Sequence, residues 1–179
     1  MAKKEAAVRD LTMVEVALTA VLALATVAHA ATRTVAVFEF EFADTSLEGE
    51  TNGPRADEQA RLARLGGELR GRLAQSGRFS VVDIASVAAQ AHSSNLQACG
   101  GCDAGFAQVL GAEFAVTGWV QKVSNLILNM NIAVRDAETA RLVASMSVDM
   151  RGNTDESWSR ALDWLIRNRL LASDSAVLR

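Results

Sequence analysis

The chain has 179 residues, of which 50% are hydrophobic, 22% charged and 5% aromatic, and its formal net charge is -3. A disordered chain is poor in apolar residues, so this composition excludes disorder, and the single proline excludes a proline-rich or collagen-like architecture. A sequence pI of about 5.4 argues against nucleic-acid binding, which typically needs a basic surface.

The first 30 residues have the pattern of a secretory signal peptide. A basic head precedes the apolar run 16–28, and the small residues Ala28 and Ala30 form a cleavage site. The alternative is a retained membrane anchor, but a spanning helix needs about 20 apolar residues and this run is shorter. No cysteine follows the site, so a lipoprotein anchor is not expected. We therefore expect cleavage after Ala30, one α/β domain over 31–179, periplasmic localisation and no stable membrane insertion after cleavage.

The first element after the leader is predicted to be a strand over 34–42. Alternation along it puts one set of apolar side chains on one face and Glu39 and Glu41 on the other, the apolar set being Ala36, Phe38, Phe40 and Phe42. A long polar loop is predicted over 43–57, because glycines and Pro54 interrupt regular structure there.

The middle of the chain is predicted to contain three helices and one strand. Leucines at three- and four-residue steps predict an amphipathic helix over 58–75. A strand over 78–83 and a short helix over 84–91 follow. After a turn that carries two cysteines, a further short helix is predicted over 103–110.

The last third of the chain is predicted to be a three-stranded meander followed by a helix. Clean alternation predicts strands over 113–123, 126–134 and 141–150, with one covered face and one wetter face. The final helix is expected over 155–171, capped by Asn153 or Thr154. The order β-α-β-α-α-β-β-β-α predicts an α+β fold, with a mixed sheet of about five strands and helices mainly on one face.

The only two cysteines, Cys99 and Cys102, are interpreted as a structural disulfide, because exported proteins usually oxidise such a pair. A redox dithiol is an alternative, since a helix N-terminus lowers a thiol pKa. Asp103 beside Cys102 argues against it. A metal site made of His92, Cys99 and Cys102 is a third alternative, but it is one ligand short of a closed tetrahedral zinc site.

Several segments together carry a resemblance to known proteins: VAVFEFEFADTSLEG, GRFSVVD, LGAEFAVTG and DAETA. The chain resembles an uncharacterised family of secreted bacterial proteins of unknown function. More distantly, it is similar to the amino-terminal domain of TolB and to the periplasmic domain of the curli secretion channel CsgG. That resemblance implies an adaptor or assembly element of the cell envelope without an active site. CsgG-type channels begin with a lipidated cysteine, whereas Ala31 stands here, which argues against a channel.

Enzyme signatures are absent from the sequence: it has no G-x-S-x-G elbow, P-loop, H-E-x-x-H or G-x-G-x-x-G motif. No catalytic residue, metal ligand or cofactor is therefore predicted. Long polar loops on rigid strands often carry binding groups. Contacts with a partner are predicted in the polar loop and its adjoining sheet face, and at one helix tryptophan, specifically at Asp44, Thr45, Ser46, Glu48 and Trp164.

Three functions remain open from the sequence. The favoured hypothesis is an exported, non-catalytic periplasmic adaptor or accessory protein that binds another exported or cell-envelope protein. The first alternative is a periplasmic thiol-disulfide protein that uses Cys99 and Cys102. A second alternative, implied only by the resemblance, is a small-molecule or metal-binding accessory of a quinoprotein oxidation system.

Overall fold

The structure is a computed structural model that describes residues 32–172. The predicted signal peptide and its cleavage site lie outside these residues. The described residues form six strands and five helices, in the order β1 (Arg33–Val37), β2 (Glu41–Asp44), α2 (Leu47–Asn52), α3 (Ala56–Gln75), β3 (Phe79–Val81), α4 (Ala88–Ser93), α5 (Cys102–Val109), β4 (Phe114–Ser124), β5 (Ile127–Asp136), β6 (Leu142–Met150) and α6 (Asp155–Leu165). One π-helical turn, Ile166–Leu170, extends α6. Within residues 32–172, no helix has the length and hydropathy needed to cross a membrane.

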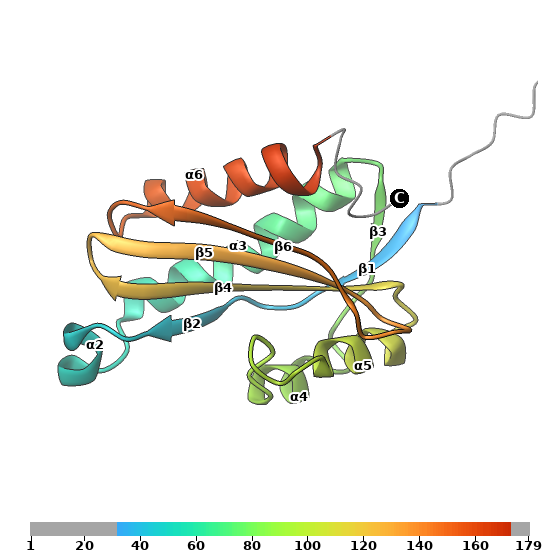
Figure 1. The fold of residues 1–179 in the computed structure, drawn as a ribbon, viewed down its shortest axis with the longest axis horizontal. Helices are drawn as coiled ribbons and strands as arrows, with labels where there is room; N and C mark the ends of the chain where they lie inside the picture. The colour runs from blue at the N-terminus through green and yellow to red at the C-terminus, as the bar shows by residue number, and fades with distance from the viewer. Residues whose placement is uncertain (1–31, 173–179) are drawn as a thin grey trace, which may run out of the picture. The chain divides into compact units, whose positions relative to one another are not determined.

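All six strands belong to one mixed sheet (Figure 1), so the predicted α+β fold is confirmed. The strand order is β3-β1-β4-β5-β6, and β2 pairs with β4 further along the same edge. The three N-terminal strands run parallel to their partners, because helices connect them. The meander β4-β5-β6 is antiparallel, as its alternating sequence predicts.

Each face of the sheet buries its own apolar cluster. The two long helices, α3 and α6, cover one face, where Leu69, Leu162 and Leu165 are fully buried. The short helices α4 and α5 cover part of the other face at one end of the strands (Figure 1), where Phe38 and Ala107 are buried. The rest of that second face, toward α2, is not covered by any helix of the described chain. It is the wetter face of the predicted meander.

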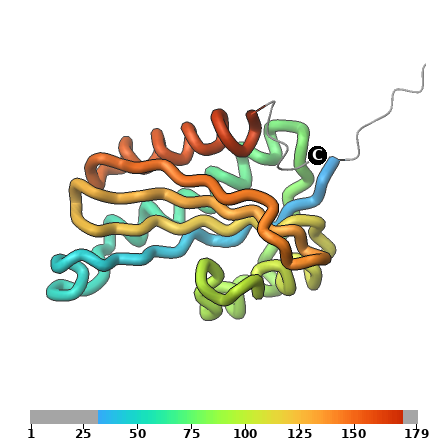
Figure 2. The backbone as a smooth tube through the Cα atoms, in the orientation of Figure 1, coloured from blue at the N-terminus to red at the C-terminus, as the bar shows by residue number. Residues whose placement is uncertain are grey.

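The predicted strand over 34–42 is two strands with a bend between them. Val37 pairs with Val116 and Glu41 with Trp119. Four residue steps from β1 to β2 therefore lie opposite three residue steps of β4. The extra residue reverses the alternation. Ala36 and Phe38 therefore face the α4–α5 cluster, while Phe40 and Phe42 face the α3–α6 cluster, and the prediction that all four share a face is wrong. Figure 2 shows β1 and β2 as one continuous path alongside β4.

The bend depends on a glycine in the neighbouring strand. A Cβ at Gly118 would overlap the ring of Phe40, which lies directly over the β4 backbone. Glycine in a strand often marks such a close approach. The absence of a side chain at Gly118 therefore lets Phe40 cross into the α3–α6 core.

The predicted polar loop over 43–57 instead contains the helix α2, so that prediction is wrong. The Ser46 hydroxyl accepts a hydrogen bond from the Gly49 amide at 3.1 Å and caps the helix. Gly53 ends the helix with a positive φ of 72°, a conformation that glycine adopts without strain. The glycines that suggested a loop therefore belong to a short helix and its C-terminal end.

The remaining boundaries lie close to the predicted ones, with one correction at the start of β6, while at the start of α6 the structure decides between the two predicted caps. At the start of β6, Arg135 pairs with Leu142 and Val134 with Ala144, so a bulge at Val143 moves Leu142 off the core face. Leu142 is accordingly exposed. At the start of α6, Thr154 is the capping residue, because its hydroxyl accepts a hydrogen bond from the Ser157 amide.

Candidate functional site

A buried lysine gathers acidic side chains from three elements at one end of the sheet. Lys122 of β4 is fully buried, and its Nζ donates to Glu58 of α3 at 2.7 Å and to Glu48 of α2 at 2.9 Å. A third carboxylate, that of Asp44 at the end of β2, lies 3.4 Å from the same nitrogen. Burying an unpaired charge costs several kcal/mol, so Lys122 requires these partners. We call this set the Lys122 cluster.

Asparagine side chains extend the Lys122 cluster to the two turns at this end. The Asn153 amide, between β6 and α6, donates to Glu58 and to the Oδ1 of Asn125. Asn125, in the turn between β4 and β5, donates to Glu48 at 2.9 Å. Glu48 therefore bonds both to Lys122 and to the turn beyond it. The hydrogen bonds hold α2, the β4–β5 turn and the start of α6 in one arrangement.

Arginines neutralise the outer part of the same end. Arg61 of α3 donates to Asn153, Asp57 and Asp155, and its guanidinium lies 5.8 Å from the ring centre of Trp158. The Trp158 indole N–H in turn donates to Asn153 at 3.0 Å. The Arg61 guanidinium thus links the N-terminal ends of α3 and α6.

The charges of the Lys122 cluster stabilise each other. Hydrogen bonds from Lys122, then from Asn125 and Arg55, lower the pKa of Glu48 to about 2. Burial alone would lower the pKa of Lys122, but its bonds to Glu58 and Glu48 outweigh that effect, and the pKa is raised. Burial would likewise raise the pKa of Asp44, yet the hydrogen bonds from Ser46 leave it below its ordinary value. All three groups are therefore charged at neutral pH.

One carboxylate oxygen in this cluster has no hydrogen-bond partner among residues 32–172. Glu58 is fully buried, and its Oε1 accepts from Lys122 and Asn153, whereas its Oε2 makes no hydrogen bond with the described part of the chain. An unsatisfied carboxylate oxygen costs free energy, which makes the pairing with Lys122 more important. The buried ion pair between Glu58 and Lys122 is therefore the main electrostatic interaction of the site.

Exposed apolar side chains surround this charged cluster. Leu47 of α2 is 77% exposed, and at the β4–β5 turn Leu126 is 73%, Ile127 61% and Val123 53% exposed. Leu47 and Leu126 each adjoin a residue of the hydrogen bond between Glu48 and Asn125. A surface pocket of about 410 Å³ lies beside the turn, lined by Val123, Leu126, Ile127 and the end of β6. Clusters of exposed apolar side chains mark interaction sites.

The loop residues predicted to contact a partner lie together in the structure, but they make internal contacts. Asp44 accepts two hydrogen bonds from Ser46, and Thr45 donates to the Lys122 carbonyl. Glu48 belongs to the Lys122 cluster. Trp164 lies elsewhere, on α6, and is 40% exposed.

The residues at the centre of this cluster are not among those predicted from the sequence. Lys122 is the only lysine after residue 30, in a chain rich in arginine. Its side chain is compact enough for three carboxylates to converge on it, whereas a guanidinium is broad and planar. That lone lysine was the available signal. Nothing in the sequence marks Glu58 or Asn153.

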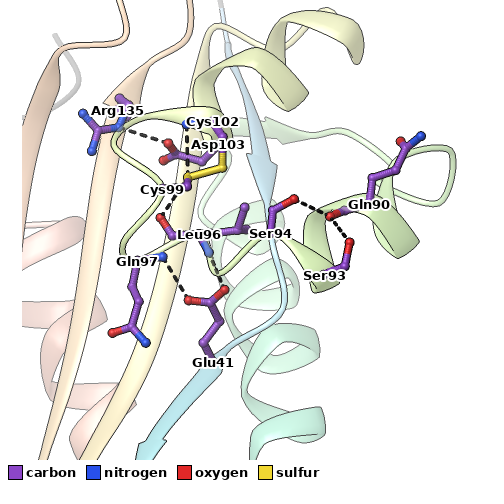
Figure 3. The surroundings of a disulfide bond; sticks show 10 residues. All are labelled: Glu41, Gln90, Ser93, Ser94, Leu96, Gln97, Cys99, Cys102, Asp103 and Arg135. Carbon is purple, nitrogen blue, oxygen red and sulfur yellow. Dashed lines mark hydrogen bonds and ion pairs between the residues drawn. A yellow bond between two sulfur atoms is a disulfide. The ribbon is translucent and has the colours of Figure 1, made fainter.

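A second hollow of about 360 Å³ lies between the β1–β2 bend, α3 and α4. His92, Glu39 and Glu41 line it. The Glu41 carboxylate accepts the backbone N–H groups of Leu96 and Gln97, and so ties β2 to the turn that precedes the cysteines (Figure 3). Both carboxylates are engaged within the chain, because Glu39 pairs with Arg70.

Cys99 and Cys102 are joined by a disulfide in the structure, at the start of α5 (Figure 3). Both side chains pack against the α4–α5 apolar cluster. Asp103, next to the disulfide, is buried and bonds to Arg135 of β5. Within residues 32–172, no three His, Cys, Asp or Glu side chains are grouped in a way that could hold a metal ion.

Several solved structures are similar to this chain, at low sequence identity and with TM-scores below 0.5. The LpoB C-terminal domain from Salmonella enterica is 17% identical, with a TM-score of 0.46 over 67% of this chain and 83% of that one. Lipoprotein GNA1162 from Neisseria meningitidis is 14% identical, with a TM-score of 0.44 over 79% and 99%. A putative neuraminyllactose-binding hemagglutinin homolog from Helicobacter pylori is 10% identical, with a TM-score of 0.45 over 80% and 87%.

No curated protein matches the chain. The distant likeness to TolB and CsgG stays a prediction. One family model, DUF3280, matches residues 33–170, which is most of the chain. The chain therefore belongs to this family, whose description is protein of unknown function (DUF2380).

Proposed function

We propose that this protein is a non-catalytic adaptor of the cell envelope that binds another exported or envelope protein at the end formed by α2 and the β4–β5 turn. The signal-peptide pattern of residues 1–30 supports export to the periplasm.

One observation supports the proposal most: exposed apolar side chains lie on elements that the charged Lys122 cluster holds in place. Leu47, Leu126 and Ile127 project from a helix and a turn that the Lys122 cluster fixes to the sheet. A partner that covers them gains apolar burial at about 25 cal/mol per Å², with little cost for ordering the site. Glu48 and Asp44 support this surface through their ion pairs with Lys122.

Crosslinking at single positions tests the proposal. A photoreactive amino acid is placed at Leu126, and a matched one at Val109 of α5, which is 74% exposed at another part of the molecule. We expect crosslinks to a specific envelope protein from position 126 in intact cells and none to that protein from position 109. Equal crosslinking from both positions, or none from position 126, would contradict the proposal.

A pair of charge substitutions gives an independent measurement. Leu126→Asp removes apolar area at the proposed surface, and Val109→Asp makes the same change outside it. We expect only Leu126→Asp to abolish the specific crosslink made from position 127, with both variants keeping the circular dichroism spectrum and melting temperature of the parent protein. Unfolding of Leu126→Asp is controlled for by those two measurements.

A further inference from the structure

The strand β6 ends the sheet, and its outer edge has no backbone partner among residues 32–172. Alternate residues of an edge strand turn their N–H and C=O groups outward, where another strand can pair with them. Natural edge strands are usually protected by proline, lysine or several charges. β6 has nine residues (LVASMSVDM), and Asp149 is its only charge.

A groove lies beside the C-terminal end of this unprotected edge. It has a volume of about 320 Å³ and is bounded by the end of β6 and by one side of α6, with Val148, Ala161 and Trp164 among its lining residues. α6 runs alongside β6 in the opposite direction (Figure 1). A strand added to β6 would therefore place alternate side chains in the groove, beside the exposed indole of Trp164.

We propose that a second copy of this chain occupies the edge, with β6 pairing antiparallel to β6 around a two-fold axis close to Ser147. In that register Ser145 lies opposite Asp149 of the second copy, and Met146 lies opposite its Val148. The pairs across the dyad are then apolar on the α6 side of the sheet and polar on the open side, which matches the alternation of β6.

The position of Trp164 agrees with this axis. Trp164 lines the same groove as Val148, which adjoins Ser147. In the proposed dimer the two indoles therefore lie close to the two-fold axis, where each can cover the groove of the other copy.

The charges on α6 are complementary under the same two-fold rotation. The helix begins with Asp155 and Glu156 and its extension ends with Arg167 and Arg169. Two antiparallel copies place the acidic start of one helix beside the basic end of the other, with their helix dipoles opposed. Arg169 has no ion-pair partner among residues 32–172 and is exposed, so it is free to pair with Glu156 of the second copy. This self-complementarity of charge favours a second copy of the chain over an unrelated peptide as the partner of β6.

Sedimentation analysis of the purified protein tests the proposal. We expect a monomer–dimer equilibrium, and we expect Ser147→Lys, which puts two positive charges next to each other at the axis, to raise the dimer Kd at least about a hundredfold. Gln121→Lys adds the same charge to the same open face on the interior strand β4 and is expected to leave the dimer intact. Trp164→Ala is expected to raise the Kd at least about tenfold, as loss of a central aromatic contact does.

A charge-exchange series decides the relative orientation of the two copies. Arg169→Glu and Glu156→Arg are each expected to weaken the dimer, and the double variant Glu156→Arg/Arg169→Glu is expected to restore it. A protein that stays monomeric up to about 1 mM overturns the proposal, since only Kd values weaker than the millimolar range escape detection there. An oligomer that Ser147→Lys leaves intact, or one that the double variant fails to restore, overturns it as well. The crosslink from position 126 does not depend on this edge, so either proposal can fail alone.

Discussion

At the scale of single residues, Lys122 is the side chain on which the α2 end depends most. Replacing it with methionine leaves Glu58 buried without its cation, and breaking such a buried pair costs about 3–5 kcal/mol. We expect Lys122→Met to lower the free energy of unfolding in urea by that amount. Arg160→Met removes a cation from an exposed ion pair and is expected to cost less than about 1 kcal/mol.

A double variant separates the charge effect from packing. If the loss comes from the uncompensated carboxylate, Lys122→Met/Glu58→Met should recover much of the stability, because apolar replacement of a buried ion pair is often nearly neutral. A double variant less stable than Lys122→Met alone would show that the methionine at position 122 packs poorly, and would assign the loss to shape.

The lowered pKa of Glu48 predicts how the free energy of unfolding changes with pH. Its pKa is about 2 in the folded protein against an ordinary value of 4.5, so the unfolded chain binds the proton first as the pH falls. The stabilisation is complete above pH 4.5 and is lost progressively down to pH 2. We expect the unfolding free energy of Glu48→Gln to fall less steeply over this range than that of the parent protein.

The matched control for this measurement is Glu50→Gln on the same helix. The Glu50 side chain makes no ion pair within residues 32–172, so its replacement should leave the pH dependence almost unchanged. Parallel pH profiles for the parent protein and Glu48→Gln would show that the bonds to Lys122 and Asn125 do not hold Glu48 ionised.

At the scale of elements, the cysteine turn before α5 is a local restraint. The Cys99–Cys102 bridge closes a very small loop, so removing it should cost no more than about 2 kcal/mol of unfolding free energy. We expect the double variant Cys99→Ser/Cys102→Ser to keep α5 in place, because Asp103 still bonds to Arg135 and Ala107 stays buried.

The same variant tests the thiol-disulfide alternative. Under the adaptor hypothesis, the specific crosslink from position 126 should persist in the double serine variant at unchanged intensity. Loss of that crosslink or of biological activity in a folded variant, together with a reduction potential in the range of known oxidoreductases, would instead favour a redox role. Each outcome assigns the cysteines to one of the two functions.

At the scale of the whole molecule, the two faces of the sheet differ in how far helices cover them. One face is fully used by α3 and α6, which bury the larger apolar cluster. The other face is covered by α4 and α5 at one end only, so the α2 end stays open with the Lys122 cluster beneath its exposed apolar residues. The asymmetry of helix placement thus leaves a surface that is both rigid and accessible.

The sequence predicts the fold to a larger extent than it predicts the candidate site. Alternation correctly predicted the meander, because side chains along a strand change face at every residue whatever lies beyond. It failed at the β1–β2 bend, where one extra residue opposite β4 reverses the faces, and at Val143, where a bulge does the same. A bulge depends on the partner strand, so the pattern along one strand does not report it.

The sequence by itself determined the local features: the helix periodicity of α3 and α6, the strand alternation of β5 and the cysteine pair. These depend on neighbours within a few residues, and local backbone geometry decides them. Only the tertiary structure decided that Glu48, Glu58 and Asn153 converge on the β4 strand at Lys122. Charges far apart in the chain become partners through the pairing register of the sheet and the packing of helices on it, which no periodicity encodes.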